Sequence, residues 1–185
     1  MNTVAHNLCF LLWQQEQPRQ TWAGRVAKWV GGDARRSEEL LKGSQPTVDE
    51  LRSLATALGL PDEDLQFADL LADSGLNIWQ ENVLHLLSTL QRGENGELAE
   101  ALGVAPGTIS KWKKREHVPE KTHQAKFRHF FELHSVDLDT ESLFLSPTPT
   151  DLVGRRRWLC DRIQSIDGKT LQLLFPALER LLSEP

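Results

Sequence analysis

A short segment beyond the middle of the chain concentrates side chains that can bind a polyanion. Within eight residues it contains two hydroxyl groups and then four cations. Hydroxyl groups contact base edges and phosphates, and lysine and arginine reach phosphate oxygens. Small polar residues near a helix start, followed by cations, are typical of a helix that enters the major groove of DNA. The residues that we expect to point outward are Thr108, Ser110, Lys111, Lys113, Lys114 and Arg115.

Two short helices with a sharp turn between them are needed to present that segment. Leu98, Ala99 and Leu102 give one apolar face, and the small Ala99 lets a second helix cross closely. Gly103 suits a turn that needs positive φ, and Pro106 suits the first turn of the next helix. Apolar side chains that we expect to be buried are Val104 in the turn, and Ile109 and Trp112 on the second helix.

Residues 96–115 resemble the lambda-repressor-like (Cro/repressor, XRE) helix-turn-helix family in Leu98-Ala99, Leu102-Gly103-Val104 and Thr108-Ile109-Ser110-Lys111-Trp112. The resemblance implies that Ala105–Arg115 is the recognition helix, so that Ala105 and Gly107 also contact DNA. It further implies units of five short helices, with Val83–Gln91 before the motif and Lys121–Leu133 after it. The alternative is a helical hairpin with a solvated charged face.

The chain also contains an imperfect internal repeat. Val26–Gly31 aligns with Leu98–Gly103 at a shift of 72 residues, and Pro46 aligns with Pro119 at a shift of 73. Ala57–Leu60 falls roughly against Leu133–Val136. We therefore expect two copies of one helical unit.

The first copy resembles the same family more weakly. The resemblance makes Trp22–Val30 the second helix and Asp33–Leu41 the recognition helix, with Asp33 as its N-cap. It departs from the pattern at Gly31-Gly32, at Ser37, and at Glu38 and Glu39, which would face phosphates. The copy therefore either contacts DNA or is a degenerate unit used for dimerisation or effector contact. Its candidate DNA contacts are Arg25, Arg35, Arg36 and Lys42.

Composition indicates an ordinary globular protein without catalytic or metal sites. The net charge is −5, but residues 96–135 hold seven Lys/Arg against five Asp/Glu. A DNA reader needs a local basic face and not a basic total. Cys9 and Cys160 have no metal-type spacing, and no nucleophile elbow, P-loop or dinucleotide motif is present. We predict no metal, no cofactor and no enzymatic activity.

The expected fold class is all-α, because strand signals are scarce and apolar residues recur at spacings of three and four. We place one unit at residues 1–72, a second at 77–147, and a C-terminal helical hairpin at 151–185. The hairpin would pair Leu152–Ile166 with Thr170–Leu182, through a turn at Asp167-Gly168. Its apolar faces favour homodimerisation, although a lid packed on the chain's own repeats is the competing interpretation. Arg155-Arg156-Arg157 is either a basic patch or a solvated helix start.

The sequence thus predicts a cytoplasmic, sequence-specific transcriptional regulator that binds double-stranded DNA and no membrane. A homodimer would read a palindromic or inverted-repeat site, and repression needs only promoter occupancy. The alternative is an antitoxin-like or adaptor protein. It would bind a protein partner through the C-terminal hairpin and use DNA only for autoregulation.

Overall fold

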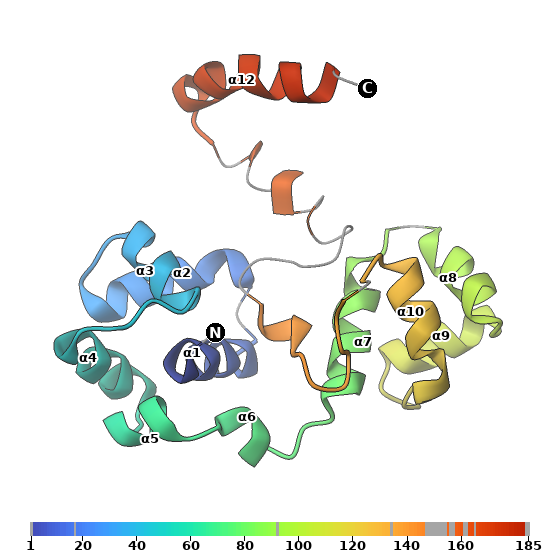
Figure 1. Ribbon diagram of the computed structural model, residues 1–185, viewed down its shortest axis with the longest axis horizontal. Helices are drawn as coiled ribbons and strands as arrows, with labels where there is room; N and C mark the ends of the chain where they lie inside the picture. Colours follow the sequence, from blue (N-terminus) through green and yellow to red (C-terminus); the bar gives the residue numbers. More distant parts are fainter. Residues whose placement is uncertain are drawn as a thin grey trace.

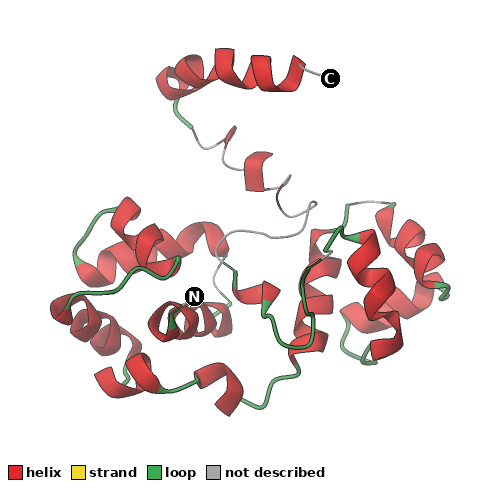
Figure 2. Cartoon of the chain, viewed as in Figure 1, coloured by secondary structure: helices red, strands yellow, loops and turns green. Residues whose placement is uncertain are grey.

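A computed structural model shows an all-α chain, as the sequence predicts. It describes residues 2–183 except 17, 92, 134, 147–154, 156, 157, 161, 162 and 165. The described part contains no strand, and its helices form two neighbouring groups with a separate C-terminal helix (Figure 1, Figure 2). The first group contains α1 (Thr3–Gln14), α2 (Arg19–Val30), α3 (Ala34–Leu41), α4 (Val48–Leu58), α5 (Asp62–Phe67) and α6 (Leu70–Asp73). The second group contains α7 (Ile78–Thr89), α8 (Glu94–Leu102), α9 (Pro106–Lys113), η1 (Lys121–His123), α10 (Gln124–Phe130) and η2 (Leu143–Leu145), and the last helix is α12 (Gly168–Ser183).

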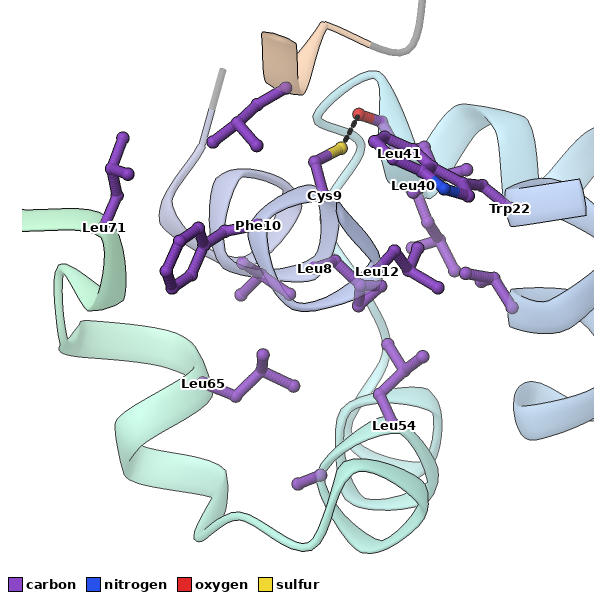
Figure 3. Close-up of a cluster of buried hydrophobic side chains, with 14 of the residues drawn as sticks. Leu8, Cys9, Phe10, Leu12, Trp22, Leu40, Leu41, Leu54, Leu65 and Leu71 are labelled. Atoms are coloured by element: carbon purple, nitrogen blue, oxygen red, sulfur yellow. Dashed lines mark hydrogen bonds between the residues drawn. The ribbon is translucent and has the colours of Figure 1, made fainter. Parts of the chain in front are cut away.

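The first core forms around α1, which is apolar on most of its surface and therefore has to be enclosed. Leu8 and Leu12 are at most 1% exposed. They lie among Leu54 of α4, Leu65 of α5 and Trp22 of α2 (Figure 3). Helices α2 to α5 thus wrap around a central first helix.

The second core is built mainly from aromatic rings. Trp79 of α7 meets Phe127 of α10 edge to face, with ring centroids 5.5 Å apart. Phe127 stacks on Phe131 at 6.1 Å and lies 6.0 Å from Trp112 of α9. The indole N–H of Trp79 donates to the carbonyl oxygen of Pro119 at 2.7 Å. Large rings on three elements fix the position of α9, because tilting it would open gaps in a close-packed interior.

The two groups share one backbone design. Each contains the same three turn hydrogen bonds, with N···O distances of 2.8–3.1 Å, at shifts of 72, 72 and 73 residues. The N–H to carbonyl pairs are Gly32 to Ala27, Ser44 to Glu39 and Leu60 to Ala55 in the first, and Val104 to Ala99, Glu116 to Lys111 and Leu133 to Arg128 in the second. The chain therefore contains a structural duplication.

One buried asparagine in the first helix of each unit strengthens this equivalence. Asn7 and Asn82 are at most 1% exposed, and each bonds to two carbonyls and one N–H of the segment that closes its own unit, at 2.7–3.3 Å. The partners are Leu65, Ala68 and Leu70 for Asn7, and Leu138, Glu141 and Leu143 for Asn82. Each partner of Asn82 lies 73 residues after its counterpart. These amides satisfy backbone groups that would otherwise be buried without hydrogen bonds.

A three-residue helical turn, η2, joins the two units. Its Leu143 is buried in the second core, whereas Phe144 and Leu145 are buried in the first. The ring of Phe144 lies 4.8 Å from the ring of Trp13, and Arg19 donates to the Leu143 carbonyl at 2.9 Å. η2 lies between α1 and α7 in Figure 1. The closing segment of the second unit thus fixes that unit to the first.

Two expectations need correction or lie outside the described residues. The alignment of Ala57–Leu60 with Leu133–Val136 is wrong by three residues, because the equivalent bonds place Leu60 opposite Leu133. Gly59, with φ 70°, then corresponds to Glu132, with φ 56°, so no glycine marks the second turn. The first helix of the predicted hairpin, with Arg156 and Arg157, lies partly outside the described residues. The second is α12, which stands apart from both units in Figure 1.

Candidate nucleic-acid interface

The pair formed by α8 and α9 has the local geometry that the sequence predicts. Gly103 adopts φ 73°, and the N–H of Val104 donates to the Ala99 carbonyl at 2.9 Å. Ala99 is 1% exposed, so its small side chain lies in the close crossing between the two helices. Pro106 occupies the first turn of α9, where its missing N–H leaves no bond unmade. The chain reverses within a few residues and presents α9 at the surface.

Helix α9 has one buried and one exposed face. Ile109 and Trp112 are 1% and 4% exposed and pack in the second core. The opposite face carries the predicted contact residues. Thr108 is half-buried, whereas Ala105, Gly107, Ser110, Lys111, Lys113 and Lys114 are exposed. Of the residues predicted on this helix, the structure therefore brings all but Arg115 to one accessible surface in and around α9.

The lysines of that surface are not neutralised by carboxylates. Among the described residues, none of Lys111, Lys113 and Lys114 forms an ion pair. The nearest glutamate in the sequence, Glu116, forms no such pair either. An exposed helix with unpaired cations gains most from a partner that supplies anionic oxygens at several points, as a DNA backbone does.

Arg115 is held differently from its neighbours. Its φ is 59°, in the left-handed region, and its guanidinium donates to both carboxylate oxygens of Glu81 on α7, at 2.5 and 2.8 Å. The Glu81 side chain is only 5% exposed, whereas that of Arg115 is 53% exposed. This forked geometry is the strongest that arginine makes with a carboxylate, and the hydrogen bonds to Glu81 raise the pKa of Arg115. Arg115 therefore anchors the end of α9 and keeps part of its guanidinium accessible.

The first unit contrasts with the second, because most of its candidate contact residues are engaged within the protein. Arg36 donates to both oxygens of Glu50 at 2.8 and 2.7 Å and to the Gln45 carbonyl at 2.9 Å. Glu50 also closes a capping box with Thr47, and the Arg36 bonds lower the pKa of Glu50 to about 2. This network holds the loop between α3 and α4 against the helix.

The remaining cations of the first unit have similar partners. Arg35 lies 3.4 Å from Glu39, Lys42 lies 3.6 Å from Glu38, and Arg25 donates to Gln15 at 3.4 Å. Ser37, at the position of Ile109, is fully buried and donates to the Asp33 carbonyl. Asp33 caps α3 as expected, accepting from the Arg36 N–H at 2.7 Å. Helix α3 carries two cations and two anions, so its surface is far less attractive to a polyanion than that of α9.

Sequence reasoning did not identify the residues that position these surfaces. Glu81, Asn82 and Asn7 are polar residues inside otherwise apolar helices, a pattern that is as compatible with solvent exposure as with burial. A usable signal existed for the asparagines, since Asn7 and Asn82 fall at corresponding points of the repeat. Asparagine has low helix propensity, so its presence twice in a helix interior indicates a specific bond.

Comparisons with known proteins give no match for this chain, whether with family models, curated proteins or solved structures. Any functional assignment therefore depends on the geometry above. None of the described helices combines the length and the apolar character that crossing a bilayer requires.

Proposed function

We propose that this protein is a sequence-specific DNA-binding regulator that reads DNA through α9. The observation that carries the proposal is the surface of α9, where exposed lysines without ion-pair partners lie beside small polar residues on a helix fixed by a buried tryptophan. Such a helix fits the major groove, with Thr108 and Ser110 toward base edges and the lysines toward phosphates. In family terms it is a lambda-repressor-like helix-turn-helix protein with a duplicated unit, acting as a repressor.

The first unit contributes less to DNA affinity in this proposal. Its α3 surface is balanced in charge, and Arg36 serves the fold through Glu50. The duplicated unit thus keeps the scaffold of a DNA reader, while the second copy makes the main contacts.

The chain acts as a homodimer in this proposal, and α12 is the pairing element. Leu174 and Phe175 of α12 are 42% and 58% exposed, and Leu171 and Leu178 share their helical face. A single eight-residue helix contacts few base pairs, so a two-fold partner doubles the contacts and requires an inverted repeat. Light scattering on the full chain, with Leu174→Asp/Phe175→Asp as the variant, tests the pairing. A monomeric wild type that still binds DNA tightly would favour the adaptor alternative.

Fluorescence anisotropy with DNA from the protein's own upstream region tests the assignment of α9. The variant Lys111→Ala/Lys113→Ala/Lys114→Ala should lose specific binding and lower the slope of log K against log salt by about 2.7, or ~0.9 per phosphate contact. The matched control is Lys28→Ala/Arg35→Ala/Lys42→Ala, which removes the same charge from the first unit.

The control should retain specific binding. An equal loss in both variants would mean that overall charge and not α9 determines affinity, and full affinity in the α9 variant would refute the assignment. Circular dichroism checks that both variants remain folded. Footprinting on the same DNA gives the protected length, which distinguishes one reader per chain from two.

A further inference from the structure

An open cavity of about 250 Å³ lies at the junction of the two units. Trp13 and Arg19 line it from the first unit, Glu81 and Ser88 from α7, Phe144 from η2, and Arg115 from the end of the α9 segment. Cavities at the meeting point of two packed units are common places for small ligands. This cavity falls just below the range of roughly 300–1,000 Å³ typical for drug-sized molecules, so it suits a molecule with a single ring.

The walls of this cavity combine aromatic and cationic surfaces. Trp13 and Phe144 lie with centroids 4.8 Å apart and at 55° to each other, which forms an apolar corner. Arg115 uses two of its five N–H donors on Glu81 and is 53% exposed, so its other donors are available to a ligand. His85, which also lines the cavity, is neutral near pH 7 because burial and Arg19 lower its pKa to about 3.

The charge balance of the cavity favours an anion. Arg19 and Arg115 supply two positive charges, and Glu81 supplies one negative charge that is already bound to Arg115. We propose that the cavity binds a small organic anion, with one aromatic ring against Trp13 and Phe144 and a carboxylate on the Arg115 guanidinium. Arginine binds carboxylates through paired N–H donors, which gives this site a directional preference for such a group.

A ligand at this position would also act on the DNA-reading surface. Arg115 directly follows α9 and holds its end to Glu81, and a carboxylate ligand competes with Glu81 for the same guanidinium. Arg115 and Lys113 together line a second hollow of about 400 Å³ beside the first. Binding therefore shifts the end of α9 and changes DNA affinity. This regulatory consequence depends on the proposed function, whereas binding to the cavity does not.

Fluorine NMR with 4-fluorobenzoate as the probe and the full chain without DNA tests the binding step. The probe signal should broaden and shift on titration, with a dissociation constant on the order of 1 mM or below for so small a ligand. The uncharged 4-fluorobenzyl alcohol should bind at least tenfold more weakly, because it offers the ring without the carboxylate.

Two tryptophan variants locate the site. Ser88→Trp fills the cavity from an exposed position on α7 and should abolish the probe response. Thr56→Trp adds the same ring at an exposed position on α4, away from the cavity, and should leave the response unchanged. No response from the wild type, equal binding of the alcohol, or an unchanged response in Ser88→Trp would each overturn the proposal. Since DNA is absent from these experiments, they stand or fall separately from the DNA-binding assignment, and repeating the anisotropy assay with saturating probe then tests the coupling.

Discussion

The Arg115–Glu81 pair leads to a quantitative prediction, because its two partners differ sharply in exposure. Glu81 is 5% exposed and Arg115 is 53% exposed. Removing one partner of a buried ion pair typically costs about 3–5 kcal/mol, since the other charge stays buried and unpaired. In Arg115→Ala the stranded charge is the buried carboxylate. Water entering the space left by the half-exposed arginine reduces the cost, so we expect a loss of about 2–3 kcal/mol in the free energy of unfolding.

The reverse substitution should cost much less. In Glu81→Gln the stranded charge is Arg115, whose guanidinium already reaches solvent, and the new amide oxygen still accepts one of its hydrogen bonds. We expect a loss of about 1 kcal/mol or less. The double variant Glu81→Gln/Arg115→Ala leaves no buried charge, so it should be more stable than Arg115→Ala alone.

Urea denaturation followed by tryptophan fluorescence measures these differences, with buried Trp79 and Trp112 as reporters. Arg52→Ala is the control, because its pair with Asp49 at 3.7 Å joins two exposed side chains and should contribute about 0–1 kcal/mol. If Glu81→Gln costs as much as Arg115→Ala, then burial of the carboxylate does not determine the energetics and the reasoning fails.

Three further predictions follow from buried groups. Burial, with a contribution from Arg19, lowers the pKa of His85 from 6.5 to about 3, so the unfolded chain binds a proton that the folded chain does not. Stability is therefore lost as pH falls below about 6.5, by about 1–2 kcal/mol at pH 5, and urea midpoints of His85→Gln should show a weaker pH dependence. A thiol reagent at pH 8 should label the exposed Cys160 in the native protein, whereas Cys9, whose pKa is raised to about 12 by burial, should react only on unfolding; labelling of both thiols at equal rates would contradict the buried position. Asn82→Ala should cost about 2–3 kcal/mol in the same urea assay, because it leaves three buried backbone groups without partners, and a loss below 1 kcal/mol would show that water replaces the amide.

The local parts of the candidate interface were predictable from the sequence because local residues determine them. Gly103 is needed for φ 73°, Pro106 fits the first turn of α9, and the spacing of Ile109 and Trp112 sets the buried face. Each of these choices depends on neighbours within one helical turn or two. Periodicity and turn chemistry report on that range.

The interactions that hold the interface in place were not predictable, because they join residues far apart in the chain. Arg115 finds Glu81 across 34 residues, and Asn82 finds the Leu138 carbonyl across 56. A glutamate in a helix has the same sequence signature whether it faces water or an arginine. The repeat alignment failed at Glu132 for a related reason, since the backbone there repeats the turn of Gly59 without repeating the residue.

The way η2 joins the two units has a consequence for how the protein folds. Contacts such as Arg19 with the Leu143 carbonyl join residues 124 positions apart, so the chain must close a long loop before they form. Helical units with local contacts form quickly, whereas contacts of this separation slow folding and form late. Docking of Phe144 against Trp13 should therefore be the last step of folding. The cavity at the junction exists only after that step, so a ligand there would recognise the finished molecule and would favour its completion by mass action.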